Sequence, residues 1–155
     1  MTDIAELEMA TSQIREDPMS IELYLLRGKT WYELKCFDEC ASDLLFYEAS
    51  GGTDPEFRKY LGMALIKTTS RNGLRYLREY VNDNRDDMSS LVFLAESYFG
   101  IGEYDSSASF YKMAIEKGYD PTILRVKAAA LAESKMYDEA AIFDASFGKR
   151  SFFRR

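Results

Sequence analysis

The feature that most constrains this chain is a helix-start signal that recurs at a fixed interval. Asp54-Pro55 and Asp120-Pro121 lie 66 residues apart. Aspartate is a preferred N-cap residue and proline is favoured at the first helical position, so both pairs predict the start of a helix. Half of that interval, 33 residues, predicts a third start at Asp87-Met88, and a further step back from Pro55 predicts one near Ile21. A period of this length indicates stacked structural repeats.

Within each repeat, apolar residues follow helical periodicity in two successive stretches. In the third repeat, Leu91, Ala95 and Tyr98 share one helical face before Gly102 interrupts the pattern. A second helical pattern then covers residues 104–115. No segment shows the strict alternation of a β-strand. The sequence therefore predicts an all-α chain built from pairs of helices.

The repeats also share a packing signature, a small residue followed three positions later by a large one. The small residue lets a neighbouring helix approach closely, and the large residue fills the groove beside it. The four pairs are Gly28 with Trp31, Gly62 with Leu65, Ala95 with Tyr98, and Ala128 with Leu131.

These motifs carry a resemblance to a known family. The Tyr-x-x-Arg-Gly-x-x-Trp of residues 24–31, the Gly-x-Tyr of residues 102–104, the Asp-Pro starts and the period together resemble the tetratricopeptide repeat (TPR) family. The resemblance covers about residues 21–147 and is weakest in the second repeat, where Arg58 and Arg71 replace expected apolar or aromatic residues. It implies a right-handed α-solenoid of antiparallel helix pairs, with about four TPR units after an N-terminal helix.

The same pattern predicts how the chain is divided. We expect an N-terminal helix within residues 1–18, a TPR array over residues 19–147, and a basic and aromatic C-terminal tail at residues 148–155. The four units are expected at about residues 21–54, 55–87, 88–120 and 121–147.

The resemblance also implies a binding surface, because the first helices of TPR units line a concave groove that holds a peptide, a helix or another repeat protein. Positions outside the shared packing stripe are apolar and aromatic here, which favours an apolar segment of a partner protein. The alternative interpretation is that adjacent helices cover these side chains. The predicted groove residues are Leu25, Lys29, Tyr32, Tyr60, Met63, Ile66, Phe93, Glu96, Phe99, Arg125 and Val126.

One specialised form of this groove is not expected. Co-chaperone members of the family grip the C-terminal carboxylate of a chaperone through Lys, Asn and Arg on successive first helices. The corresponding positions here hold Leu25 and Lys29, then Tyr60, then Ser89 and Phe93. Only Lys29 matches that pattern, so we expect no chaperone carboxylate clamp.

Composition argues against catalysis. The chain has no histidine and two cysteines, which removes the commonest general base, the commonest metal ligand and any four-thiolate site. Cys36 and Cys40 have no nearby group that would lower a thiol pKa, so we interpret them as small buried hydrophobic residues. We expect no enzymatic activity, no cofactor and no metal.

Charge and hydropathy indicate the setting. Residues 1–144 hold 26 acidic and 16 basic residues, and the only basic run follows them at Lys149–Arg155, so we expect no nucleic-acid partner. Apolar runs are far shorter than the ~20 residues of a membrane span, and the first residues are acidic where a secretory signal is basic. We therefore expect no membrane association and an intracellular location, cytoplasmic or nuclear.

Two functional hypotheses follow. The first is a non-catalytic protein–protein interaction scaffold that binds a partner segment in its concave groove. The second is a self-associating TPR subunit of a large multiprotein complex, by analogy with subunits of the anaphase-promoting complex, in which homodimerisation is the main role.

Overall fold

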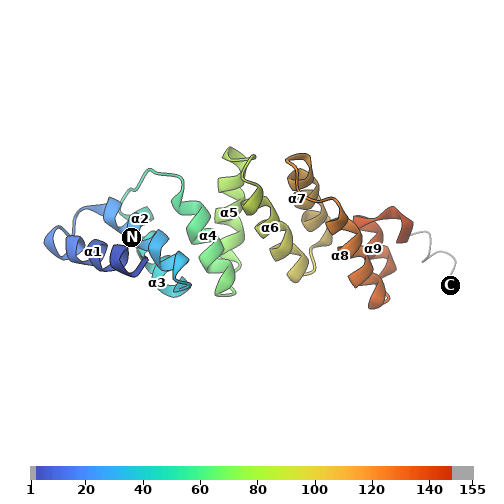
Figure 1. Ribbon diagram of the computed structural model, residues 1–155, viewed down its shortest axis with the longest axis horizontal. Coiled ribbons are helices and arrows are strands. Elements are labelled where there is room, and N and C mark those ends of the chain that lie inside the picture. The colour runs from blue at the N-terminus through green and yellow to red at the C-terminus, as the bar shows by residue number, and fades with distance from the viewer. Residues whose placement is uncertain (1–2, 148–155) are drawn as a thin grey trace. The chain divides into compact units, whose positions relative to one another are not determined.

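The structure, a computed structural model, describes residues 3–147 (Figure 1). The elements described below are all α-helices, as the periodicity predicts. The chain divides into two compact units, residues 1–83 and residues 84–155, each with its own cluster of buried side chains. The predicted tail at residues 148–155 lies outside the described residues.

The N-terminal unit is built from a leading helix and two helix pairs. The leading helix packs against α2 through Ala10 and Ile14, which lie one turn apart on the same face. α2 packs against α3, and α4 packs against both α3 and α5. The helices are α1 (Asp3–Glu16), α2 (Ile21–Glu33), α3 (Phe37–Ala49), α4 (Phe57–Lys67) and α5 (Asn72–Asp83).

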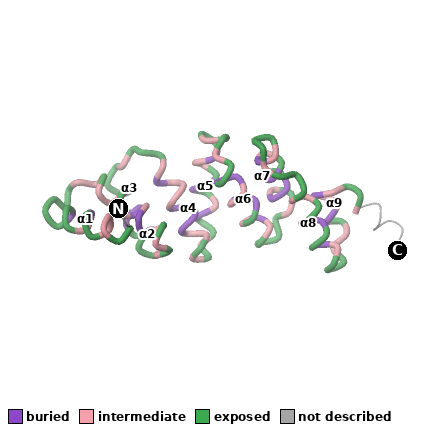
Figure 2. The backbone as a smooth tube through the Cα atoms, viewed as in Figure 1, coloured by how far each residue is buried: buried purple, intermediate pink, exposed green. Residues whose placement is uncertain are grey.

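The core of the N-terminal unit lies between α2, α3 and α4. Leu44, Tyr47 and Leu61 are completely buried, and the buried segments of the tube in Figure 2 follow these helices. The hydroxyl oxygen of Tyr47 accepts a hydrogen bond from the backbone amide of Asp54 at 2.9 Å. A buried tyrosine needs such a partner for its polar end, so this bond ties the loop before α4 to the core.

Two glycines let α4 and α5 approach each other closely. A Cβ atom added to Gly62 of α4 would stand 2.9 Å from the backbone oxygen of Gly73, and one added to Gly73 of α5 would stand 2.5 Å from the backbone oxygen of Gly62. The two backbones therefore touch where α4 crosses α5. Only glycine at both positions permits this contact.

The C-terminal unit repeats the same plan. α6 pairs with α7 and α8 pairs with α9. The small residue Ala95 lets α7 approach, and the Ser107 hydroxyl donates a hydrogen bond of 2.7 Å to the Ala95 carbonyl. Tyr111 and Phe143 supply the large side chains of this core. The helices are α6 (Met88–Gly100), α7 (Tyr104–Glu116), α8 (Thr122–Glu133) and α9 (Tyr137–Phe143).

All three aspartates of the start signals accept a backbone hydrogen bond, but only Asp87 is the N-cap of its helix as predicted, and neither proline occupies the first helical position. Asp87 is the N-cap of α6 and accepts the Ser90 amide at 3.2 Å. The side chains of Asp54 and Asp120 each accept a 3.0 Å hydrogen bond from the backbone amide of the residue two positions later. The following prolines precede the first helical residue instead of forming it, because the chain first makes a tighter turn with bonds between residues three apart.

The turn inside each helix pair repeats one backbone conformation. Lys35, Thr69, Gly102 and Lys135 all have positive φ, at 60°, 65°, 82° and 61°. These positions are 34, 33 and 33 residues apart, so the turn follows the sequence period. A left-handed residue ends the first helix and allows the chain to reverse into the second.

Candidate partner-binding site

The N-terminal unit brings three of the predicted groove residues together on neighbouring first helices. Lys29 of α2 forms a 2.8 Å ion pair with Glu56, which immediately precedes α4. The Lys29 ammonium also lies 5.5 Å from the ring centroid of Tyr60, and the rings of Tyr32 and Tyr60 meet edge to face at 5.6 Å. We call the surface formed by Lys29, Tyr32, Glu56 and Tyr60 the α2–α4 face.

The ion pair of the α2–α4 face stays partly exposed to solvent. Burial lowers the pKa of Lys29, but the hydrogen bond and the negative charge of Glu56 outweigh it, so the net pKa is raised. Burial is also the main cause of the raised pKa of Tyr32. Lys29 is therefore a cation and Tyr32 a neutral phenol at physiological pH, next to a half-exposed carboxylate.

Three predicted groove residues of the N-terminal unit have other surroundings. Leu25 is only 6% exposed and belongs to the core cluster. Met63 is 7% exposed, and its sulfur accepts a hydrogen bond from the Tyr32 hydroxyl at 3.6 Å, so it supports the α2–α4 face from beneath. Ile66 is half-buried beside Gly73 of α5. These side chains pack against adjacent helices, which is the alternative considered for the sequence.

The C-terminal unit has a comparable arrangement around Glu96 of α6. One carboxylate oxygen accepts a 2.9 Å hydrogen bond from Lys127 of α8, and the other accepts the hydroxyl of the buried Tyr111. The Lys127 ammonium lies 4.4 Å from the ring centroid of Phe99. We call the surface formed by Glu96, Phe99 and Lys127 the α6–α8 face.

Both partners change the ionisation of Glu96. Burial raises its pKa, but the hydrogen bonds from Tyr111 and Lys127 outweigh burial and the net pKa is lowered. The pKa of Tyr111 is raised, first by burial and then by its bond to the carboxylate. Glu96 is therefore a firmly ionised carboxylate, held between a phenol and an ammonium group.

The remaining predicted residues of the C-terminal unit differ in exposure. Phe93 is half-buried. Phe99 contacts Tyr104 and Phe143 edge to face, at 5.3 and 5.6 Å, so much of its ring belongs to the core. Arg125 has an 81% exposed side chain that lies 3.7 Å from Asp144, and Val126 is 58% exposed.

Sequence reasoning missed Glu56 and Lys127, although a sequence signal exists for Lys127. Lys29 and Tyr60, Tyr32 and Met63, and Glu96 and Lys127 all lie 31 residues apart. Contacts between successive first helices therefore fall two residues short of the 33-residue period. A search for complementary side chains at this offset would have found Lys127 opposite Glu96.

Burial raises the pKa of the Cys40 thiol to about 12, so this cysteine is a poor nucleophile. Within residues 3–147, no cluster of three or more His, Cys, Asp or Glu side chains is placed to hold a metal ion. None of the helices described has the length and apolar character needed to cross a membrane.

Sequence comparisons leave the chain unassigned, whereas its fold has clear counterparts. No family model matches the sequence, and a comparison with curated proteins yields no match. Among solved structures, YrrB, a TPR protein with an unusual peptide-binding site, has a TM-score of 0.70 and 16% identity. That alignment covers 90% of this chain and 76% of YrrB.

Two further solved structures have the same arrangement of helices. MamA aligns with a TM-score of 0.73 at 13% identity, covering 95% of this chain and 88% of MamA. The C-terminal part of a TPR repeat-containing protein from Cytophaga hutchinsonii aligns with a TM-score of 0.66 at 16% identity, covering 91% of this chain and 57% of that one. Identities this low establish likeness of fold.

Proposed function

We propose that this chain, which has the TPR fold of antiparallel helix pairs, is a non-catalytic scaffold that binds a segment of a partner protein on the first helices of its pairs. The observation that carries the proposal is the repeated combination of an aromatic ring with an ion pair on the α2–α4 face and on the α6–α8 face. Function is inferred from these faces and not from the fold alone.

The chemistry of the two faces favours a partner segment with mixed character. Half-buried aromatic rings provide rigid apolar area, which is typical of residues that dominate binding energy. Beside the rings, each face carries a partly exposed ion pair whose two charges can orient a polar group of the partner. YrrB, which has a similar fold, has a peptide-binding site, and this supports a peptide segment as the partner here.

Charge-changing substitutions at residues outside the core test each face. Lys29→Glu reverses the charge of Lys29 on the α2–α4 face, and Val126→Glu introduces a negative charge at the exposed predicted groove residue that precedes Lys127 in α8. Met19→Glu is the matched control, because Met19 is 84% exposed in the loop before α2 and outside both faces. Circular dichroism would establish that each variant retains its helix content.

The measurement has two stages. Affinity capture from the source cells identifies proteins retained by the wild-type chain, and isothermal titration with each purified candidate then gives its affinity for the variants. We expect Lys29→Glu or Val126→Glu to weaken binding at least about tenfold, the scale of a binding hot spot, and Met19→Glu to leave it unchanged. Equal affinity for all three variants would place the partner elsewhere and refute the proposed faces.

Self-association is a second candidate, and the charge distribution of the N-terminal unit favours it. Residues 3–56 hold thirteen acidic and four basic residues, whereas residues 57–83 hold two acidic and six basic ones. In a twofold dimer, the acidic part of one copy and the basic part of the other would meet twice. Light scattering after size exclusion would then show a dimer that dissociates as salt is added, and a monomer at all salt concentrations would exclude it.

A further inference from the structure

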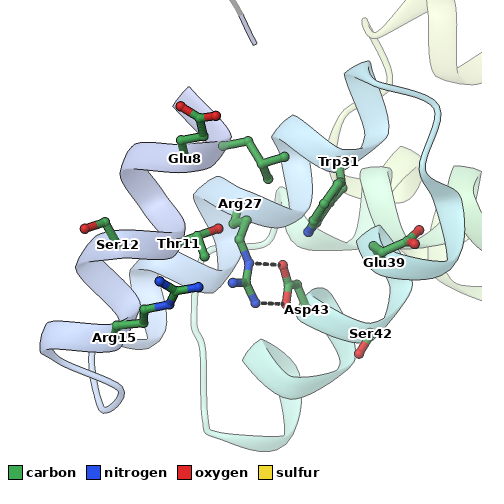
Figure 3. Close-up of a pocket in the computed structure, with 10 residues that line it drawn as sticks. Glu8, Thr11, Ser12, Arg15, Arg27, Trp31, Glu39, Ser42 and Asp43 are labelled. Carbon is green, nitrogen blue, oxygen red and sulfur yellow. Dashed lines mark hydrogen bonds and ion pairs between the residues drawn. The ribbon is translucent and has the colours of Figure 1, made fainter. Parts of the chain in front are cut away.

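A cavity of the N-terminal unit that shares no residue with the α2–α4 face lies between α1, α2 and α3. It has a volume of about 580 Å³, within the range of small-ligand sites. Figure 3 shows side chains from all three helices around it, including the ring of Trp31. We call it the α1–α3 pocket. Its lining residues are Leu7, Glu8, Thr11, Ser12, Arg15, Arg27, Trp31, Glu39, Ser42 and Asp43.

The pocket contains a rigid ion pair that is already satisfied. The Nε and Nη2 atoms of Arg27 donate to the two carboxylate oxygens of Asp43 at 2.7 and 2.8 Å, as the dashed lines in Figure 3 show. The side chains are only 19% and 8% exposed. Such a two-pronged pair is geometrically fixed and cancels its own charge. Arg27 and Asp43 therefore connect α2 to α3, and the net charge of the pocket depends on its other charged residues.

The other charged residues of the pocket have no partner among the described residues. The side chains of Glu8 in α1 and Glu39 in α3 form no ion pair or hydrogen bond within residues 3–147, and the same holds for the side chain of Arg15 in α1. Figure 3 shows Arg15 and Glu39 on opposite walls. The pocket thus offers two unpaired carboxylates against one guanidinium group, with an aromatic ring in the wall.

The surrounding charge increases this bias. Residues 3–56, which include all three helices of the pocket, hold thirteen acidic residues and four basic ones. A cleft whose surroundings carry mostly one sign of charge concentrates ligands of the opposite sign. An indole ring is also the best aromatic partner for a cation.

We propose that the α1–α3 pocket binds a basic segment of a partner protein, with a lysine or arginine side chain against the Trp31 ring and its charge facing Glu8 and Glu39. The bound group is a cation, because both the local carboxylates and the wider field favour one. This site shares no residue with the α2–α4 face or the α6–α8 face. Its test is therefore independent of the proposed function.

Trp31 is the only tryptophan of the chain, so its fluorescence reports on the pocket without labelling. The full chain would be titrated with an octapeptide of Lys, Arg, Gly and Phe that contains no tryptophan, followed in parallel by calorimetry. The matched probe is the same peptide with every Lys and Arg replaced by Glu. We expect a saturable change of Trp31 emission with the basic peptide, weakened by added salt, and none with the acidic peptide.

Two substitutions in the pocket should act in opposite directions. Glu39→Gln removes an attractive charge and should weaken binding of the basic peptide about threefold to tenfold. Arg15→Gln removes a repulsive charge and should strengthen binding by a similar factor. Glu33→Gln is the control, because it removes the same charge as Glu39→Gln from an exposed residue of α2 that does not line the pocket.

The outcomes separate the proposal from its alternatives. No heat and no emission change with the basic peptide would overturn it, as would equal binding of the acidic peptide. Equal losses from Glu33→Gln and Glu39→Gln would also overturn it, because attraction would then come from net charge and not from the pocket. Lys29→Glu and Val126→Glu should leave the peptide affinity within about twofold of wild type, whether or not the two faces bind their own partner.

Discussion

Three residues other than glycine hold a left-handed backbone where the first helix of a pair turns into the second. Lys35, Thr69 and Lys135 do so, while the equivalent position in the third pair is Gly102. This conformation crowds a Cβ atom against the following carbonyl and costs about 1 kcal/mol or more. The strain is greatest for a β-branched residue, so Thr69 is the least favourable of the three.

Thr69→Gly should therefore stabilise the chain. Relief of the backbone strain exceeds the extra chain entropy that glycine loses on folding, so we expect the free energy of unfolding to rise by about 0.5–1 kcal/mol. Urea denaturation at constant pH measures it. The reverse change, Gly102→Thr, is the control, because a Cβ at Gly102 meets nothing within 4 Å and only the backbone is tested. A loss of stability in Thr69→Gly would mean that its exposed side-chain bond to the Thr68 carbonyl matters more than the strain.

At the level of helices, the crossing of α4 and α5 depends on direct backbone contact between Gly62 and Gly73. Separation of the two helices would expose Leu61 and Leu77, which are completely buried. The second repeat, whose match to the TPR pattern is weakest, thus keeps its helices together through two glycines. The general small-residue position supplies Gly62, and only Gly73 is specific to this repeat.

Gly73→Ala should destabilise the protein although alanine is the better helix former. The added methyl group would overlap the Gly62 carbonyl and the Ile66 backbone, so we expect the free energy of unfolding to fall by about 1–3 kcal/mol. Gly100→Ala at the end of α6 is the control, since nothing lies within 4 Å of its added Cβ, and helix propensity should stabilise it by up to about 1 kcal/mol. Thermal unfolding followed by circular dichroism compares the two. Equal effects would show that the crossing relaxes at no cost.

For the whole molecule, the absence of histidine sets the response to pH. No side chain has an ordinary pKa between the carboxylates and the thiols, so protonation of side chains changes little near neutrality. The carboxyl pKa of Glu96 is lowered, so its stabilisation is present above the pKa of the unfolded chain and is lost as pH falls through the folded value. We therefore expect the protein to lose stability at acid and at alkaline pH, and not near neutrality.

The loss of stability at alkaline pH should depend on the thiol of Cys40. Its thiol has a pKa of about 12 when folded, because burial disfavours the thiolate, against about 8.5 in an unfolded chain. The unfolded chain releases this proton at lower pH than the folded chain. The contribution of Cys40 to stability is therefore fully present below about pH 8.5 and falls as pH rises toward the pKa of the folded thiol. Urea midpoints across this range should decline less steeply for Cys40→Ala than for the wild type. Identical slopes would show that tyrosines, not Cys40, carry the alkaline loss.

The sequence by itself determined the helix pairs, their period and the small-residue crossings of this protein. These follow from interactions between near neighbours in the chain: aspartate side chains that accept the first amides, and apolar residues spaced to fall on one helical face. Asp87 and the Gly28, Gly62, Ala95 and Ala128 series were predicted for this reason, and all four small residues are buried. Even the prolines were misplaced by only one or two residues.

Only the tertiary structure decided which side chains each helix presents. Leu25 and Met63 looked like groove residues, but neighbouring helices bury them. Trp31 packs against the core, as its packing position predicts, and only the structure shows that it also lines the α1–α3 pocket. The pairing of Glu96 with Lys127 depends on an offset of 31 residues between helices. Helical periodicity defines a face only to within about one residue, or 100° of rotation, whereas a contact between helices depends on the rotation of each about its own axis.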